Sequence, residues 1–130
     1  MYLLDTSAIL AHCFGEEGAG LVRKILAQKE GFVASVSWFE LRVQLQEYPE
    51  ADEIIRNYET AAASTFAITH EIAAAAFELR RLSGIRIPTV DALIAATAKI
   101  NGLQLIHRDP HFATIPADLL KQVMLPTKAK

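Results

Sequence analysis

IRIPTVDALIAATAKINGLQLIHRDPHF, the stretch Ile85–Phe112, decides the fold of this chain. Its first half is apolar or alanine on nearly every helical face, which predicts a helix buried on all sides with Thr89 as its N-cap. The pair Asn101–Gly102 ends this helix, because either residue adopts the left-handed cap conformation. Leu103–Ile106 then predicts a short buried strand, and the turn signal Asp109–Pro110 follows it.

Two carboxylates stand out in this stretch. Asp91 lies in the first turn of the predicted helix, and Asp109 lies just beyond the predicted strand. In an open α/β sheet both positions face the crevice beyond the carboxyl ends of the strands, where ligands bind.

Length and composition limit the kind of protein. With 130 residues, the chain is expected to form a single domain, residues 1–130, with a frayed tail at 126–130. No apolar run is long enough to span a membrane, and no signal peptide is visible. The single cysteine, Cys13, excludes an internal disulfide and suits a reducing cytoplasm. The net charge of −2 argues against nucleic-acid binding by charge alone, but not against an enzyme whose positive charge comes from metal ions.

Strands and helices alternate along the chain. Continuously apolar segments predict strands at Tyr2–Leu4, Phe32–Val36 and Thr65–Ile68, with an edge strand at Val123–Leu125. Between them, the helices are predicted near Ala8, Val22, Ser37, Ile54 and Thr69. Buried strands that alternate with helices indicate a parallel sheet covered on both faces. The predicted fold is a three-layer α/β/α sandwich with a central parallel sheet.

Four acidic residues each have an ordinary structural explanation. Asp5 follows the first strand and can cap the next helix. Glu40 fits a capping box with Ser37, in the pattern S-x-x-E. Asp91 complements the positive end of its helix, and Asp109 precedes proline in a turn. Taken singly, none of the four needs a functional role.

Together these four acids predict a cation site. Each lies at the carboxyl end of a strand or at the start of a helix, and in a doubly wound sheet these places converge on one edge. Clustered carboxylates repel each other and remain ionised at neutral pH only with a cation between them. Oxygen ligands favour Mg²⁺ or Mn²⁺ over zinc. Such an ion lowers the pKa of bound water and holds a phosphate oxygen, which suits phosphodiester hydrolysis.

Four segments of the chain carry a resemblance to a known family. They are LDTSAI (Leu4–Ile9), SWFEL (Ser37–Leu41), PTVDALIAATA (Pro88–Ala98) and LIHRDPHF (Leu105–Phe112). In this order and spacing they resemble the PIN-domain nucleases, and among these the VapC-type toxins of bacterial and archaeal toxin–antitoxin pairs. The resemblance covers nearly the whole chain.

The resemblance implies an Mg²⁺- or Mn²⁺-dependent ribonuclease that forms a homodimer and is blocked by a cognate antitoxin protein. By position, Asp5, Glu40, Asp91 and Asp109 match the family's acidic residues, which bind metal and act in catalysis. The hydroxyls of Thr6 and Ser7 fit as their supporting partners. One departure is His107, because the family commonly has threonine or serine there. Whether the His107 imidazole joins the site stays open at this stage.

Other side chains are expected to be structural. His12, His70 and His111 show no metal-ligand spacing with each other, so each is expected to be an ordinary surface or core residue. Trp38 and Phe39 are expected in the core or in a dimer interface. The arginines near the loop before Asp91 are more often a solvated face than an RNA contact; they are Arg80, Arg81 and Arg86.

Four other functions compete with the toxin. An aspartyl-phosphate phosphatase needs a second aspartate two residues after the first, and Ser7 stands there. A phospho-acceptor receiver domain needs an acidic pair after the first strand, which the chain lacks. A non-catalytic PIN-like binding module is disfavoured because all four acids are present. A housekeeping PIN-type RNA-processing nuclease remains open, and an adjacent gene for a small DNA-binding protein with a disordered tail would favour the toxin.

Overall fold

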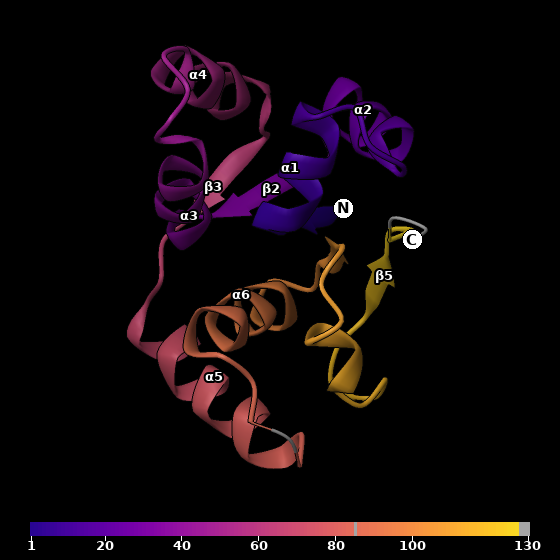
Figure 1. The fold of residues 1–130 in the computed structure, drawn as a ribbon. Helices are drawn as coiled ribbons and strands as arrows, with labels where there is room; N and C mark the ends of the chain where they lie inside the picture. The colour runs from indigo at the N-terminus through magenta and orange to yellow at the C-terminus, as the bar shows by residue number, and fades with distance from the viewer. Residues whose placement is uncertain (85, 128–130) are drawn as a thin grey trace.

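The central element is a five-stranded sheet in which every strand is parallel to its neighbours, in the order β3-β2-β1-β4-β5. The computed structural model describes residues 1–84 and 86–127 (Figure 1). The strands are β1 (Tyr2–Leu4), β2 (Gly31–Ala34), β3 (Ser64–Phe66), β4 (Gln104–His107) and β5 (Gln122–Met124). The predicted parallel sheet is confirmed, including its C-terminal edge strand.

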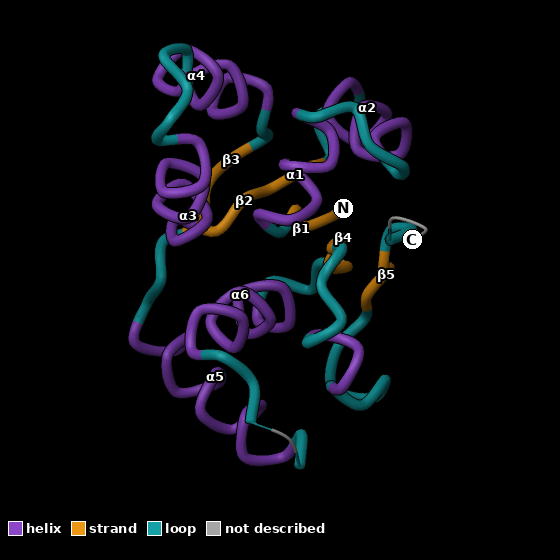
Figure 2. Tube along the Cα trace, in the orientation of Figure 1, coloured by secondary structure: helices purple, strands orange, loops and turns teal. Residues whose placement is uncertain are grey.

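Helices cover both faces of the sheet, which confirms the predicted three-layer sandwich. Within the described residues, one group of helices packs on one face and a second group on the other (Figures 1 and 2). The first group is α1 (Thr6–Cys13), α2 (Ala19–Ala27), α3 (Ser35–Leu45) and α4 (Ala51–Ala61). The second group is α5 (His70–Leu82) and α6 (Thr89–Ile100), followed after β4 by the short 3₁₀ helix η1 (Phe112–Thr114).

Alternate residues of the central strands enter two separate cores. In β1, Leu3 packs on the side of α5 and α6, whereas Leu4 packs on the side of α1 and α2. In β4, Leu105 and Ile106 divide in the same way, and all four side chains are fully buried. Because successive strand residues point to opposite faces, a strand buried on both sides must be continuously apolar.

The sheet has a topological switch point between β1 and β4. The chain runs outward from β1 to β2 and β3, and then crosses to the other side of β1 to form β4 and β5. The helices α5 and α6 make this crossing on the opposite face of the sheet (Figure 1). In sheets of this kind ligands bind beyond the carboxyl ends of the strands at the switch point. Asp5 follows β1 there, and Asp109 follows β4.

Two predicted helix starts are wrong. The second strand ends at Ala34, and α3 begins at Ser35, so Ser37 lies inside the helix and makes no cap. Val36, predicted as strand, instead packs against the core from the first turn of α3. Helix α6 begins at Thr89 itself, with Pro88 in the cap position and no side-chain cap hydrogen bond. Both helices form without a side-chain cap because burial of their apolar faces stabilises them.

The predicted cap of α5 is confirmed, because the Thr69 hydroxyl accepts a hydrogen bond from the backbone N–H of Ile72 at 3.1 Å.

At the C-terminal end of the chain, the Pro126 carbonyl accepts a hydrogen bond from Arg108 Nε at 2.9 Å. Residues 128–130 of the predicted frayed tail lie outside the described residues. Among the helices that the structure describes, none has the length and hydropathy needed to cross a membrane.

Replacing Ser37 tests its corrected place in the fold. The Ser37 hydroxyl is fully buried and has no hydrogen-bond partner within the described chain. Removing an unsatisfied buried hydroxyl from a helix interior relieves a desolvation cost. Ser37→Ala should therefore leave the melting temperature unchanged or raise it, whereas Thr69→Ala should cost about 1 kcal/mol through the lost cap. Thermal unfolding of both variants measures this, and an equal loss in Ser37→Ala would restore the capping role.

Candidate cation site

Asp5 serves both as the cap of α1 and as the first acid of the site. Its Oδ2 accepts hydrogen bonds from the Ser7 backbone N–H at 3.0 Å and from the Ser7 hydroxyl at 2.5 Å. The Ser7 Oγ in turn accepts a hydrogen bond from the backbone N–H of Arg108 at 2.8 Å. Ser7 therefore connects the loop after β1 to the loop after β4 and fixes the two acidic loops relative to each other.

Glu40 reaches the same place from the second turn of α3. The Thr6 hydroxyl donates a hydrogen bond to Glu40 Oε1 at 2.6 Å, across 34 residues of sequence. The predicted capping box of Ser37 and Glu40 is therefore wrong, since Glu40 is held by Thr6 from the neighbouring helix. The two hydroxyls predicted to support the acids, those of Thr6 and Ser7, do contact Glu40 and Asp5.

Asp91 and Asp109 complete the acidic group from the other side of the switch point. Asp91 lies in the first turn of α6 and is nearly buried. Asp109 Oδ1 accepts a hydrogen bond from the backbone N–H of His111 at 2.9 Å, which closes the predicted turn around Pro110. The imidazole Nδ1 of His111 lies 3.1 Å from Asp109 Oδ1 and 3.3 Å from Asp91 Oδ2.

The four predicted acids line one small pocket. Its volume is about 160 Å³, and its walls are Asp5, Thr6, Ser7, Leu10, Glu40, Gln44, Asp91 and Asp109. Sequence analysis did not single out Leu10 and Gln44. Gln44 lies one helical turn beyond Glu40, so the spacing of four residues in α3 was the signal that pointed to it. The structure thus brings together in one pocket all four acids that the sequence predicted to converge.

Burial and like charge raise the pKa of two acids in this pocket. Burial raises the pKa of Asp5 from 3.8 to about 7, and the negative charges of Asp91 and Glu40 add to this, while the bonds from Ser7 oppose it. Burial likewise raises the pKa of Asp91 to about 6; the charges of Asp109 and Glu40 add to this, and the imidazole of His111 opposes it. The carboxylates therefore disfavour one another's ionised form.

No lysine or arginine forms an ion pair with these acids in residues 1–84 and 86–127. The nearest arginine in sequence, Arg108, instead pairs with Glu16 at 2.8 Å. Four converging carboxylates with no paired lysine or arginine among the described residues match the oxygen-rich ligand set of Mg²⁺ and Mn²⁺. The residues present therefore fit a divalent cation.

His107 does not belong to the ligand set but positions Asp109. It is fully buried, and its Nδ1 accepts a hydrogen bond from the Asp109 backbone N–H at 3.1 Å. Its Nε2 lies 2.7 Å from Oε1 of Gln122, whose amide donates to the Phe112 carbonyl at 2.9 Å. Burial lowers the pKa of His107, which suits a neutral ring with its proton on Nε2. The imidazole thus anchors the Asp109 loop to β5.

His111 was predicted to be an ordinary surface or core residue, but its ring lies beside two of the acids. Nδ1 of His111 and one carboxylate oxygen each from Asp91 and Asp109 all lie within 4.8 Å of one another. Its position two residues after Asp109 was the available signal. Of the other histidines considered, His12 bonds to Tyr58 and His70 is exposed at the start of α5, as expected.

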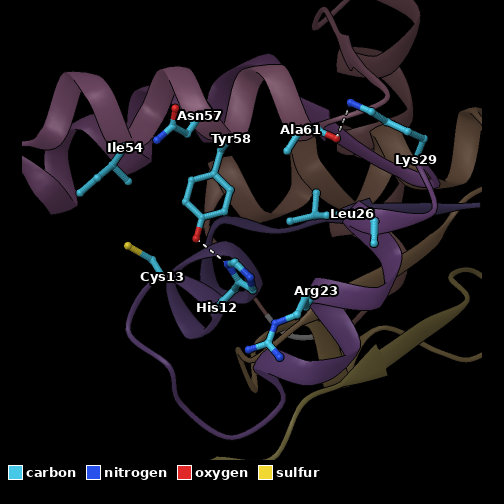
Figure 3. Close-up of a pocket in the computed structure, with 10 residues that line it drawn as sticks. His12, Cys13, Arg23, Leu26, Lys29, Ile54, Asn57, Tyr58 and Ala61 are labelled. Atoms are coloured by element: carbon cyan, nitrogen blue, oxygen red, sulfur yellow. Dashed lines mark hydrogen bonds between the residues drawn. The ribbon is translucent and has the colours of Figure 1, made fainter.

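A second, larger cavity lies between α1, α2 and α4, apart from the acids (Figure 3). Its volume is about 760 Å³, and its walls are His12, Cys13, Arg23, Leu26, Ala27, Lys29, Ile54, Asn57, Tyr58 and Ala61. The Tyr58 hydroxyl lies 2.6 Å from His12 Nδ1, and Lys29 Nζ donates to the Ala61 carbonyl at 3.1 Å (Figure 3). Burial raises the pKa of the Cys13 thiol, which agrees with a packing role.

Fold and site together define an α/β protein with an acidic pocket at the switch point of a parallel sheet. The model of the PIN domain family matches residues 2–118, and the chain belongs to this family. No curated protein sequence gives a significant match.

Solved structures share this fold over nearly their whole length. VapBC2 from Rickettsia felis, bound to a DNA fragment from its promoter, has a TM-score of 0.77 at 17% identity, covering 96% of this chain and 98% of its own. A toxin–antitoxin complex from Klebsiella pneumoniae has a TM-score of 0.73 at 25% identity, covering 95% and 97%. VapC20 from Mycobacterium tuberculosis, a sarcin–ricin loop cleaving toxin, has a TM-score of 0.69 at 17% identity, covering 97% and 100%.

The raised pKa of Asp5 predicts a pH-dependent stability in metal-free protein. A carboxyl whose pKa is higher in the folded than in the unfolded state contributes stability below its usual value of 3.8 that is lost as the pH rises through about 7. Asp5→Asn keeps an N-capping side chain but removes the charge. In the presence of chelator, this variant should therefore melt several degrees above wild type at pH 8, and the difference should shrink at pH 5. A difference in melting temperature that does not change with pH would contradict the raised pKa of Asp5.

Proposed function

We propose that this chain is a divalent-metal-dependent endoribonuclease, using Mg²⁺ or Mn²⁺, and acts in the cytoplasm as the toxin of a toxin–antitoxin pair. The observation that carries the proposal is the convergence of four carboxylates from four segments on one pocket that holds no paired lysine or arginine within the described residues. The PIN-domain match and the toxin–antitoxin structures with the same fold support it.

The proposed roles follow from the position of each acid. Asp5 and Asp91, the most buried pair, are the main ligands, and Glu40 and Asp109 complete the site directly or through water. When bound, the ion supplies a water of lowered pKa and neutralises charge that develops on the phosphate. The Thr6 hydroxyl holds the Glu40 carboxylate in place. The four acids are thus the proposed catalytic group.

RNA is the proposed substrate, and the proposed cation in the pocket is what attracts its phosphates to the acids. The net charge of −2 provides no general basic surface. Arg81 pairs with Glu78 at 2.7 Å, and Arg80 lines a cavity between α5 and α6 rather than the acidic pocket. Neither arginine therefore lies where it would hold an RNA phosphate beside the acids.

Glu40→Gln tests the proposed chemistry. The amide oxygen still accepts the hydrogen bond from Thr6, so the fold is kept while the negative charge is lost. RNA cleavage with Mg²⁺ or Mn²⁺ should fall by about a hundredfold or more, the usual contribution of a group that moves a proton or orients the reactants. Glu47→Gln, which makes the same change at an exposed position near the end of α3, should cleave normally.

The outcomes separate the remaining functions. Wild-type cleavage by Glu40→Gln would remove Glu40 from the catalytic group. If wild type neither binds the ions nor cleaves RNA, the chain is a non-catalytic PIN-like module. Cleavage without any antitoxin encoded in the adjacent gene would favour a housekeeping RNA-processing nuclease.

The cavity between α1, α2 and α4 is the proposed docking site of a cognate antitoxin. Its walls are largely apolar, and α1 connects it directly to the acids, with Asp5 at one end of the helix and Cys13 at the other. An eight-residue helix is about 12 Å long, so a bound segment that continues along α1 reaches the acidic pocket within a few residues. Toxin–antitoxin complexes among the structures with the same fold support such a partner.

Ile54→Glu tests the docking site. Ile54 is partly exposed on α4 and faces the cavity, where an unpaired charge is costly against an apolar partner (Figure 3). Co-expression with the protein encoded next to the toxin gene should yield a stable complex for wild type. The variant should lose this complex while its own RNA cleavage persists. Undiminished co-purification would place the antitoxin elsewhere.

Homodimerisation through α5 is the third part of the proposal. Phe77 is 65% exposed, and beside it lies a cavity of about 200 Å³ between α5 and α6. In a two-fold dimer, the projecting Phe77 ring of each subunit can enter the cavity of the other, so one surface patch serves both sides of the interface. Trp38 is less available for this contact, because it is partly buried against the core and donates to the Thr65 hydroxyl at 3.0 Å. The neighbouring Phe39 is 69% exposed and extends the apolar surface of the molecule.

Phe77→Glu should convert the dimer to a monomer. Light scattering at micromolar concentration is expected to give the dimer mass for wild type and half this mass for the variant. Ile54→Glu is the matched control, since the same charge in the other cavity should leave the dimer intact. A monomer mass for wild type would refute the dimer.

A further inference from the structure

His111 has a backbone that is fixed on both sides, so its ring is presented to the acids. Its N–H donates to Asp109 Oδ1 at 2.9 Å, and its carbonyl accepts from the Thr114 hydroxyl at 2.7 Å. The preceding Pro110 restricts the backbone further, because its φ is locked by the ring. The side chain itself is 59% exposed. His111 is thus held at the edge of the acidic pocket by its backbone, with little of its ring packed in the core.

The ring nitrogen lies at ligand spacing from two acids. Nδ1 is 3.1 Å from Asp109 Oδ1 and 3.3 Å from Asp91 Oδ2. Two ligands at right angles around an ion, each about 2.1 Å from it, are about 3.0 Å apart. Nδ1 therefore lies from each carboxylate oxygen at about the distance that separates two neighbouring ligands of one ion, and all three atoms lie within 4.8 Å of one another.

His107 provides an internal comparison on the same segment. Both of its ring nitrogens are already bonded, one to the Asp109 backbone and the other to Gln122, and the ring is fully buried. For His111, the described contacts of the ring are the two carboxylates alone. Of the two histidines that flank Asp109, only His111 has a ring nitrogen directed at the acids, so only this ring can ligate a cation held by Asp91 and Asp109.

We propose that His111 is a direct ligand of the divalent cation and makes this site select Mn²⁺ over Mg²⁺. The inference rests on the proposed function, since it concerns the ion held by Asp91 and Asp109. Imidazole nitrogen is a poor ligand for Mg²⁺, whose preferred shell is oxygen only, and a better one for transition metals. Replacing one oxygen by this nitrogen shifts the preference without adding charge.

The test uses Mn²⁺ as a spectroscopic probe. Pulsed electron paramagnetic resonance of wild type with one equivalent of Mn²⁺ should show nitrogen-14 coupling from a bound imidazole. His111→Asp supplies an oxygen in place of the nitrogen and should abolish this coupling while still binding the ion. By calorimetric titration, the ratio of Mn²⁺ to Mg²⁺ affinity should fall by about tenfold or more in this variant. His70→Ala, which removes an exposed histidine at the start of α5, should behave as wild type.

The outcomes distinguish this inference from the function on which it rests. If wild type binds Mn²⁺ without nitrogen coupling, or His111→Asp keeps the wild-type affinity ratio, His111 is not a ligand although the acidic site stands. If wild type binds neither ion, the cation site itself fails. Coupling that persists in His111→Asp would assign the nitrogen to another residue and overturn the proposal.

Discussion

Mutual repulsion among buried carboxylates is the constraint on which the site depends. The fold places Asp5, Glu40, Asp91 and Asp109 around one pocket and provides no paired lysine or arginine there within the part of the chain that the structure describes. Burial and like charge raise the pKa of Asp5 to about 7 and of Asp91 to about 6. A folded protein retains such an arrangement at a cost to its stability, which is typical of sites that bind a ligand of opposite charge.

The surrounding structure serves to hold these charges together. The sheet order brings β1 and β4 side by side, and their carboxyl ends open on the same crevice. The Ser7 hydroxyl bridges Asp5 and the Arg108 backbone, while His107 fastens the Asp109 backbone to Gln122. These contacts oppose the repulsion that would otherwise separate the two loops. The hydroxyl and the imidazole therefore act through the carboxylates that they position.

The fold and the four acids could be predicted from the sequence, whereas local contacts could not. Continuously apolar strands reveal a buried parallel sheet, and the sheet's geometry then places Asp5 and Asp109 at one edge. The S-x-x-E pattern at Ser37 predicted a helix cap that is wrong, because α3 already begins at Ser35. The role of His107 and the approach of His111 to Asp91 depend on how loops fold onto neighbouring elements, which periodicity does not report.

Metal-induced stabilisation tests the central claim most directly. If the acids form a cation site, Mn²⁺ or Mg²⁺ at millimolar concentration should raise the melting temperature of wild type by several degrees through mass action. Asp91→Asn should melt slightly higher than wild type in chelator, because repulsion is relieved, and should lose the response to both ions. A wild-type melting temperature indifferent to Mn²⁺ and Mg²⁺ would contradict the claim that these four carboxylates are arranged to hold a cation.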